Sequence, residues 1–143
     1  MSDTGMTSGT AAHGADAEPI ARRFEALPGL VAADTRLIDR GRFLTVDWKI
    51  GIGPLALLVS VERGRVASVA RGPFLLRPWA FALTAPAEVW RRFLEPIPAP
   101  GFHDILALSK AQRLSIEGNL QPLMANLQYV KDVLALARAH GTG

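Results

Sequence analysis

The sequence contains no cysteine among its 143 residues. Disulfide bonds, cysteine-ligated zinc and a thiol nucleophile are therefore excluded. Long apolar runs are missing as well, since the stretch Pro54–Val61 ends at charged residues far short of the roughly 20 residues that a membrane-spanning helix needs. We therefore expect a cytoplasmic protein that does not insert stably into a membrane.

Acidic side chains are outnumbered by basic ones, with 13 Asp and Glu against 16 Lys and Arg, which gives a net charge of +3. Most of these cations are arginines, and they are spread through the expected turns and polar faces. No basic run carries the interleaved aromatic residues that nucleic-acid grooves usually show. The sequence therefore predicts no nucleic-acid partner.

The common signatures of cofactor and metal chemistry are also absent. No Gly-x-Gly-x-x-Gly, Walker loop, Gly-x-Ser-x-Gly or His-Glu-x-x-His motif occurs, which removes most support for nucleotide-binding, serine-hydrolase and zinc-protease classes. His13 and His140 lie near the two ends of the chain, so His103 stands alone among scattered carboxylates. We predict neither a cofactor nor a metal site.

What the sequence does contain is enough apolar material for one core, because 49% of its residues are hydrophobic. Residues 1–17 are mostly Ser, Thr, Gly, Ala and Asp without an apolar run, so we expect a disordered N-terminal tail. Residues 18–143 are then expected to form a single domain.

The middle of the chain has the period of two that is typical of strands. Apolar and polar residues alternate over Phe43–Ile50 and Leu55–Val61, and Arg63-Gly64 predicts a tight hairpin into a third strand, Arg65–Arg71. Large and small side chains alternate over Trp79–Thr84, which predicts a fourth strand. We expect the first three strands to form an antiparallel meander.

Helical spacing flanks these strands. We predict helices over Glu18–Leu27, Pro86–Leu94 and Leu120–Ala137, a short helix opened by Asp104, and a short strand over Arg36–Arg40. Runs of strands followed by helices, rather than strict alternation, indicate an α+β fold in which helices cover one face of a mainly antiparallel sheet.

The last predicted helix has an unusually broad apolar surface. Its two apolar rows consist of Leu120, Leu123, Leu127, Val130, Leu134 and Ala137, and of Asn126, Tyr129, Val133 and Leu136. A short strand, in which Leu114 and Ile116 alternate with polar residues, leads into it. We expect this helix to lie across the sheet, with the polar atoms of Asn126 and Tyr129 on the buried side.

These elements resemble the sterol carrier protein-2-like (SCP2) family in their order and in the amino-acid sequence of the last third of the chain. The resemblance is carried by Ala56–Pro73, Trp79–Leu94 and above all His103–Leu134, and it covers roughly Thr35–Arg138. It implies a twisted, largely antiparallel sheet covered by helices, with a tunnel between them for fatty acyl chains, sterols and other lipids. It implies no catalytic apparatus.

We therefore predict a small binding protein that holds an apolar or amphipathic ligand between the sheet and the C-terminal helix. The ligand would be a fatty acyl chain, a sterol or a polyketide-like metabolite. The residues that we predict to line this site are Trp79, Phe81, Trp90, Phe93, Leu123, Asn126, Leu127, Tyr129 and Val130. Asn126 and Tyr129 would form its polar end, or else Tyr129 is a core aromatic residue whose hydroxyl reaches a partner and Asn126 a satisfied buried amide.

Two other functions stay open at this stage. A cofactor-free enzyme acting on such a metabolite would use His103, Glu117 or Tyr129, although the sequence favours a loop position for His103 and a contact with turn N–H groups or an arginine for Glu117. An accessory subunit of a lipid-metabolic enzyme would expose an apolar patch to its partner. A homodimer or a partner enzyme is compatible with the sequence.

Overall fold

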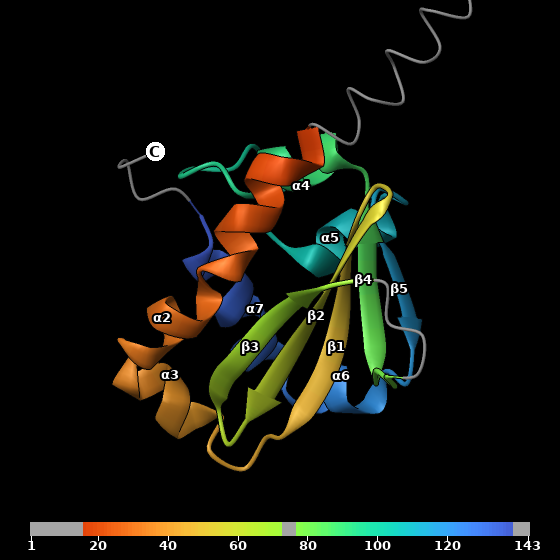
Figure 1. Cartoon of the computed structure of the whole chain (residues 1–143). Coiled ribbons are helices and arrows are strands. Elements are labelled where there is room, and N and C mark those ends of the chain that lie inside the picture. The colour runs from red at the N-terminus through yellow and green to blue at the C-terminus, as the bar shows by residue number, and fades with distance from the viewer. Residues whose placement is uncertain (1–15, 73–76, 139–143) are drawn as a thin grey trace, which may run out of the picture.

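The computed structural model describes residues 16–72 and 77–138 (Figure 1). The first fifteen residues of the predicted tail and residues 139–143 of the predicted domain lie outside the described residues. Residues 16–25 are helical, so Asp16 and Ala17 belong to this helix, and Ala17 is fully buried.

Five strands form one sheet in the order β3-β2-β1-β4-β5. The strands are β1 (Val46–Ile52), β2 (Leu55–Glu62), β3 (Arg65–Arg71), β4 (Phe81–Ala85) and β5 (Ser115–Gly118). Three of the neighbouring pairs are antiparallel, whereas β1 and β4 are parallel. The α+β class with a mainly antiparallel sheet is confirmed, and the one parallel pairing makes the sheet mixed.

Helices gather against one face of this sheet, as Figure 1 shows for α2, α5 and α7. Besides the helix of residues 16–25, they are α2 (Leu27–Ala32), α3 (Thr35–Arg40), α4 (Ala87–Phe93), α5 (Ile105–Lys110), α6 (Gln121–Ala125) and α7 (Leu127–Leu136). The short helix α5 begins as predicted, because the Asp104 carboxylate accepts a hydrogen bond of 2.9 Å from the Leu106 N–H.

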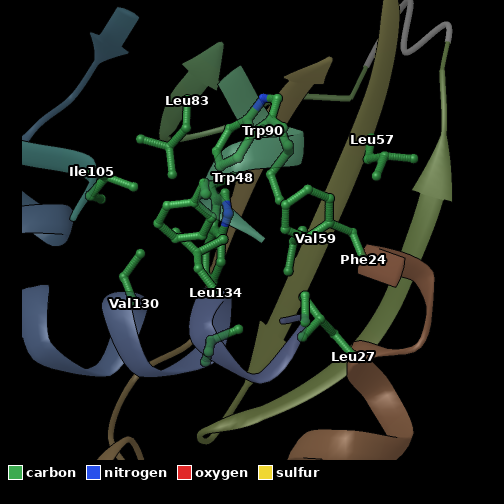
Figure 2. Packing of buried hydrophobic residues seen from close by; sticks show 14 of the residues in the cluster. Phe24, Leu27, Trp48, Leu57, Val59, Leu83, Trp90, Ile105, Val130 and Leu134 are labelled. Atoms are coloured by element: carbon green, nitrogen blue, oxygen red, sulfur yellow. The ribbon is translucent and has the colours of Figure 1, made fainter. Parts of the chain in front are cut away.

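The core lies between the helices and the face of the sheet that carries Trp48, Ile50 and Ile52 of β1. These side chains are fully buried, and side chains of the same face from β2 and β4 continue the layer. Trp48 lies in the middle of the cluster, with Leu83 of β4 on one side of it and Val130 of α7 below (Figure 2). One cluster thus joins the whole described chain.

The opposite face of the sheet also buries apolar side chains. Leu58 of β2 and Ala82 of β4 both pair with Lys49 across the ladders, and they point away from the core face because side chains alternate along a strand. Leu58 has no exposed surface and Ala82 has 1%. Leu58 therefore offers a buried position outside the main core.

The predicted hairpin between β2 and β3 is confirmed. Arg63 and Gly64 have φ angles of 51° and 82°, which is the geometry of a type I′ turn. A side chain at Gly64 would also collide with the neighbouring chain, since its Cβ would lie 2.5 Å from the Ile38 carbonyl oxygen. Glycine at this position is required for both reasons.

The predicted strand over Arg36–Arg40 is wrong, since these residues form helix α3. The Asp34 carboxylate accepts a hydrogen bond of 3.0 Å from the Leu37 N–H and caps the helix. An aspartate three residues before an apolar position is a helix start signal, and here it prevails over the short alternating pattern.

The predicted continuous helix Leu120–Ala137 is divided at Asn126 into α6 and α7. The Asn126 side-chain amide donates a hydrogen bond of 3.0 Å to the Pro122 carbonyl oxygen, which is the acceptor that the Asn126 backbone N–H would use in an unbroken helix. That N–H bonds to the Leu123 carbonyl oxygen instead. The side chain thus competes with the helical backbone and ends α6.

Candidate functional site

The residues predicted to line a ligand site fall into two groups by exposure. Six of them are buried in the core, namely Phe81, Trp90, Phe93, Leu123, Tyr129 and Val130. Trp79 is 36% exposed, whereas Asn126 and Leu127 are half-buried. The buried six share the layer between the sheet and α7, while the other three lie nearer the surface.

Aromatic rings fill the centre of this layer. Trp48 and Phe81 stack with their ring centroids 5.5 Å apart and their planes at 11°. Trp90 meets Phe24 edge-on at 5.3 Å and Phe93 at 5.5 Å. Such pairs contribute about 0.5–1.5 kcal/mol each beyond the burial of their surface. The aromatic residues therefore support the core whether or not a ligand is bound.

The two buried indole groups differ in their hydrogen bonding. Trp90 Nε1 donates a hydrogen bond of 2.8 Å to the Gly51 carbonyl oxygen. Within residues 16–72 and 77–138, Trp48 Nε1 has no hydrogen-bond partner, although Trp48 has no exposed surface. One polar atom in the middle of the core is thus left without a partner.

The predicted polar end, formed by Asn126 and Tyr129, is engaged within the protein. The Tyr129 hydroxyl donates a hydrogen bond of 2.6 Å to the Gly64 carbonyl oxygen, and burial raises the pKa of Tyr129 to about 12. The Asn126 amide is held by Pro122. Both polar groups therefore have structural roles in this arrangement.

The three candidate acid–base residues come from three different segments. His103 is exposed in the turn before α5, and Glu117 is exposed on the edge strand β5. Tyr129 is attached to the β2–β3 turn at the opposite side of the sheet, because β5 and β3 are the two edge strands. Tyr129 is therefore separated from the edge strand that carries Glu117.

A hollow of about 620 Å³ opens where β4 meets α4 and the α5–β5 turn. Its lining residues are Gly53, Thr84, Ala85, Pro86, Ser109, Gln112, Arg113, Leu114, Ser115 and Ile116. The surface inside is largely apolar, and hydroxyl, amide and guanidinium groups stand among the lining residues. Its volume lies in the range of small-molecule sites in proteins, about 300–1,000 Å³.

The turn after α5 forms one side of this hollow. The Arg113 N–H bonds to the Leu108 carbonyl oxygen at 2.9 Å, and the Gln112 N–H bonds to the Ser109 carbonyl oxygen at 3.0 Å. This pair of bonds is the Schellman motif that ends many helices, with Gln112 at a φ of 62° where glycine is usual. The reversal carries Leu114 back into the core.

Arginine charge lies beside the hollow. The Arg113 guanidinium is 4.8 Å from the centre of the Phe102 ring, and Arg92 lies over the same ring at 4.5 Å. Both arginines are exposed, so each keeps a hydrated charge at the edge of an apolar surface. A molecule with an apolar body and a polar or anionic end would meet suitable chemistry here.

A second hollow of about 410 Å³ lies at the start of β1 and β4, beside Trp79. The Lys49 ammonium is 5.4 Å from the centre of the Trp79 ring. Leu120 and Met124, four residues apart on the α6 segment, are also exposed, by 43% and 54%. This hollow is smaller than the hollow beside Ala85.

The sequence analysis did not identify the residues of the larger hollow as a site. Ser109, Gln112 and Arg113 occupy a helix end and a turn, and Ala85 and Pro86 join a strand to a helix some 25 positions earlier. Only the Schellman turn and the β4–β5 pairing bring the two segments together. The positive φ of Gln112 leaves no signal in the sequence.

A search of protein-family models finds no match for the sequence, and no curated protein matches it. Several solved structures, in contrast, resemble this chain. A crystal structure of sterol carrier protein 2 superposes with a TM-score of 0.64 at 14% identity, over 82% of this chain and 94% of that chain. The sterol carrier protein domain 2 of Helicoverpa armigera superposes with a TM-score of 0.55 at 17% identity, over 80% of this chain and 86% of that chain.

A third similar structure is the ubiquinone synthesis protein UbiJ-SCP2, with a TM-score of 0.54 at 14% identity, over 85% of this chain and 97% of that chain. At these identities the likeness establishes the fold alone. The chain therefore has the SCP2 fold, as the sequence resemblance indicated. Separately, none of the helices within the described ranges is long and apolar enough to cross a membrane.

Proposed function

We propose that the chain forms one domain, which begins with the helix at residue 16 and binds a single apolar or amphipathic small molecule, such as a fatty acyl chain, a sterol or a polyketide-like metabolite. The polar end of the ligand lies in the hollow at Arg113. Its apolar body extends past Leu83 into the layer between the sheet and α7. The protein is then a carrier or presenting protein for such a molecule.

The hollow is the observation that carries this proposal. It combines an apolar floor of Ala85, Leu114 and Ile116 with the polar side chains of Gln112 and Arg113. Small-molecule sites commonly have this composition, in which apolar surface gives affinity and a few polar groups fix orientation.

The floor of the hollow is continuous with the core. Ile116 lines the hollow and pairs with Leu83, which in turn pairs with Ile50 of β1. These three side chains lie in a row on the core face of the sheet. A displaced Leu83 side chain would therefore extend the hollow into the layer that contains Phe81 and Val130.

The names of the similar structures support the same class of ligand. Two of the proteins described above are named sterol carrier proteins, and the third is named a ubiquinone synthesis protein. The core also suits an apolar guest, because no charged side chain among the described residues is buried in it.

The experiment fills the hollow with a larger side chain and measures, by titration, how tightly the variant binds a fluorescent fatty acid. Ser109→Trp places an indole on α5 at the lining of the hollow and should weaken binding by about ten-fold or more, because the ligand loses apolar contacts. The matched control is Ser68→Trp on β3, at the far side of the sheet, which should leave affinity unchanged.

Both variants must show the far-ultraviolet circular dichroism of the parent. Equal affinity of the parent and Ser109→Trp would place the ligand elsewhere. The proposed function would be rejected if the parent protein did not bind the probe. It would also be rejected if no competing lipid displaced the bound probe.

A further inference from the structure

The unpaired indole N–H of Trp48 points to one further property of the ligand. Trp48 has no exposed surface, and within the described chain its Nε1 has no hydrogen-bond acceptor. Buried indole groups normally find a partner, as Trp90 does at the Gly51 carbonyl oxygen. A phenylalanine would fill much of the same space without a donor to satisfy.

Trp48 occupies a position that a ligand in the proposed site would reach. Its ring stacks on Phe81, and Phe81, Leu83 and Ala85 follow one another on the core face of β4. Ala85 lines the hollow. Figure 2 shows Leu83 and Ile105 on one side of Trp48, so these aliphatic side chains are the ones that must give way.

The distance from the hollow to Trp48 follows from strand geometry. Ala85 lies four positions after Phe81, and a strand rises about 3.3 Å per residue, which gives roughly 13 Å along β4. An extended alkyl chain covers this distance in about ten carbon–carbon bonds. A ligand that enters beside Ala85 and runs along β4 would therefore reach the level of Trp48, which pairs with Phe81, about ten bonds along its chain.

The chemistry around Trp48 restricts the acceptor. No charged side chain among the described residues is buried in the core, so a carboxylate or phosphate there would lack a counter-charge. A hydroxyl could accept from the indole but would bring its own donor into an apolar layer. A ketone oxygen accepts and donates nothing, and it therefore matches a lone N–H.

We propose that Trp48 Nε1 is the hydrogen-bond donor of the interior site, and that the ligand is an oxygenated chain of the oxo-acyl or polyketide type. Its ketone oxygen lies about ten bonds from its polar end. This inference rests on the proposed function, since it specifies which apolar molecule the same site prefers.

The experiment compares two acids of equal length, octadecanoic acid and 10-oxo-octadecanoic acid, as competitors of the fluorescent fatty acid. The parent protein should bind the oxo acid about three- to ten-fold more tightly, because one buried hydrogen bond is gained. Trp48→Phe should abolish this preference, so that the two acids compete with the probe equally well, whatever their common affinity for the variant. 10-Hydroxyoctadecanoic acid should bind the parent less tightly than the oxo acid.

A spectroscopic measurement on the parent protein needs no variant. In a ¹H–¹⁵N spectrum, the indole resonance of Trp48, assigned through its contact with the Phe81 ring, should move when the oxo acid binds and much less when octadecanoic acid binds. This readout decides the question even if Trp48→Phe does not fold.

Equal affinity for the two acids, or a preference that persists in Trp48→Phe, would overturn this inference and leave the proposed function intact. A bound water that contacts the indole proton with and without ligand would overturn it too. If neither acid competes with the probe, the proposed function and this inference both fail.

Discussion

The hydroxyl of Tyr129 in α7 donates a hydrogen bond of 2.6 Å to the carbonyl oxygen of Gly64 in the β2–β3 turn, 65 positions earlier in the chain. The ring also lies against Gly41, where an added Cβ would approach Tyr129 Cε1 to 2.4 Å. Tyr129 therefore joins α7 to the β2–β3 hairpin and to the end of α3.

The first prediction concerns this hydrogen bond. Tyr129→Phe should lower the free energy of unfolding by about 1–3 kcal/mol, because it removes the donor and leaves a buried carbonyl oxygen unpaired. Urea denaturation measures the change. Affinity for the fluorescent fatty acid should stay the same, since the hydroxyl is engaged at Gly64. Lower affinity with unchanged stability would return Tyr129 to the ligand site.

The second prediction is a pH dependence from the same residue, which is the chain's single tyrosine. Burial raises the pKa of Tyr129 to about 12 from an ordinary value of 10.0. The folded state therefore holds this proton more tightly than the unfolded state does, and stability is lost as the pH rises from about 10 to about 12.

Tyrosinate absorbance follows this titration without interference from another tyrosine. The expected midpoint lies well above pH 10, and the signal should be absent in Tyr129→Phe. A midpoint near pH 10 in protein that circular dichroism shows to be folded would mean that the hydroxyl is exposed to water.

The third prediction tests Leu83 as the side chain between the hollow and the interior. Leu83→Ala should lower the free energy of unfolding by about 2–5 kcal/mol and should speed uptake of the fluorescent fatty acid in stopped-flow mixing. Leu58→Ala is the matched control, because Leu58 is equally buried but lies on the opposite face of the sheet. It should cost similar stability without faster uptake, and equal uptake rates in the two variants would exclude this route.

The strands and caps were predictable because their signals are local. Alternation over a few residues identifies β1 and β2, and the Asp104 cap and the Arg63-Gly64 turn each depend on one or two side chains. The broad apolar face of the last helix likewise predicts its contact with the sheet, because such a surface must be covered.

The features that the sequence did not predict depend on contacts between distant segments or on backbone geometry. The parallel pairing of β1 with β4 joins residues more than 30 positions apart. The division of the last helix at Asn126 depends on one side-chain hydrogen bond, and the wall of the hollow depends on the left-handed conformation of Gln112. Trp90 and Phe93, which were expected to line a ligand site, meet edge-on in the core, and their contact with a ligand stays a prediction.

The most direct test of ligand binding is native mass spectrometry of the full chain, purified gently without detergent. We expect the mass of the protein plus one small molecule, released at higher collision energy, and a much reduced adduct in Ser109→Trp but not in Ser68→Trp. Identification of the adduct as a lipid or an oxygenated acyl chain would agree with binding at the hollow. Protein that remains free of adduct and takes up neither octadecanoic acid nor 10-oxo-octadecanoic acid would contradict it.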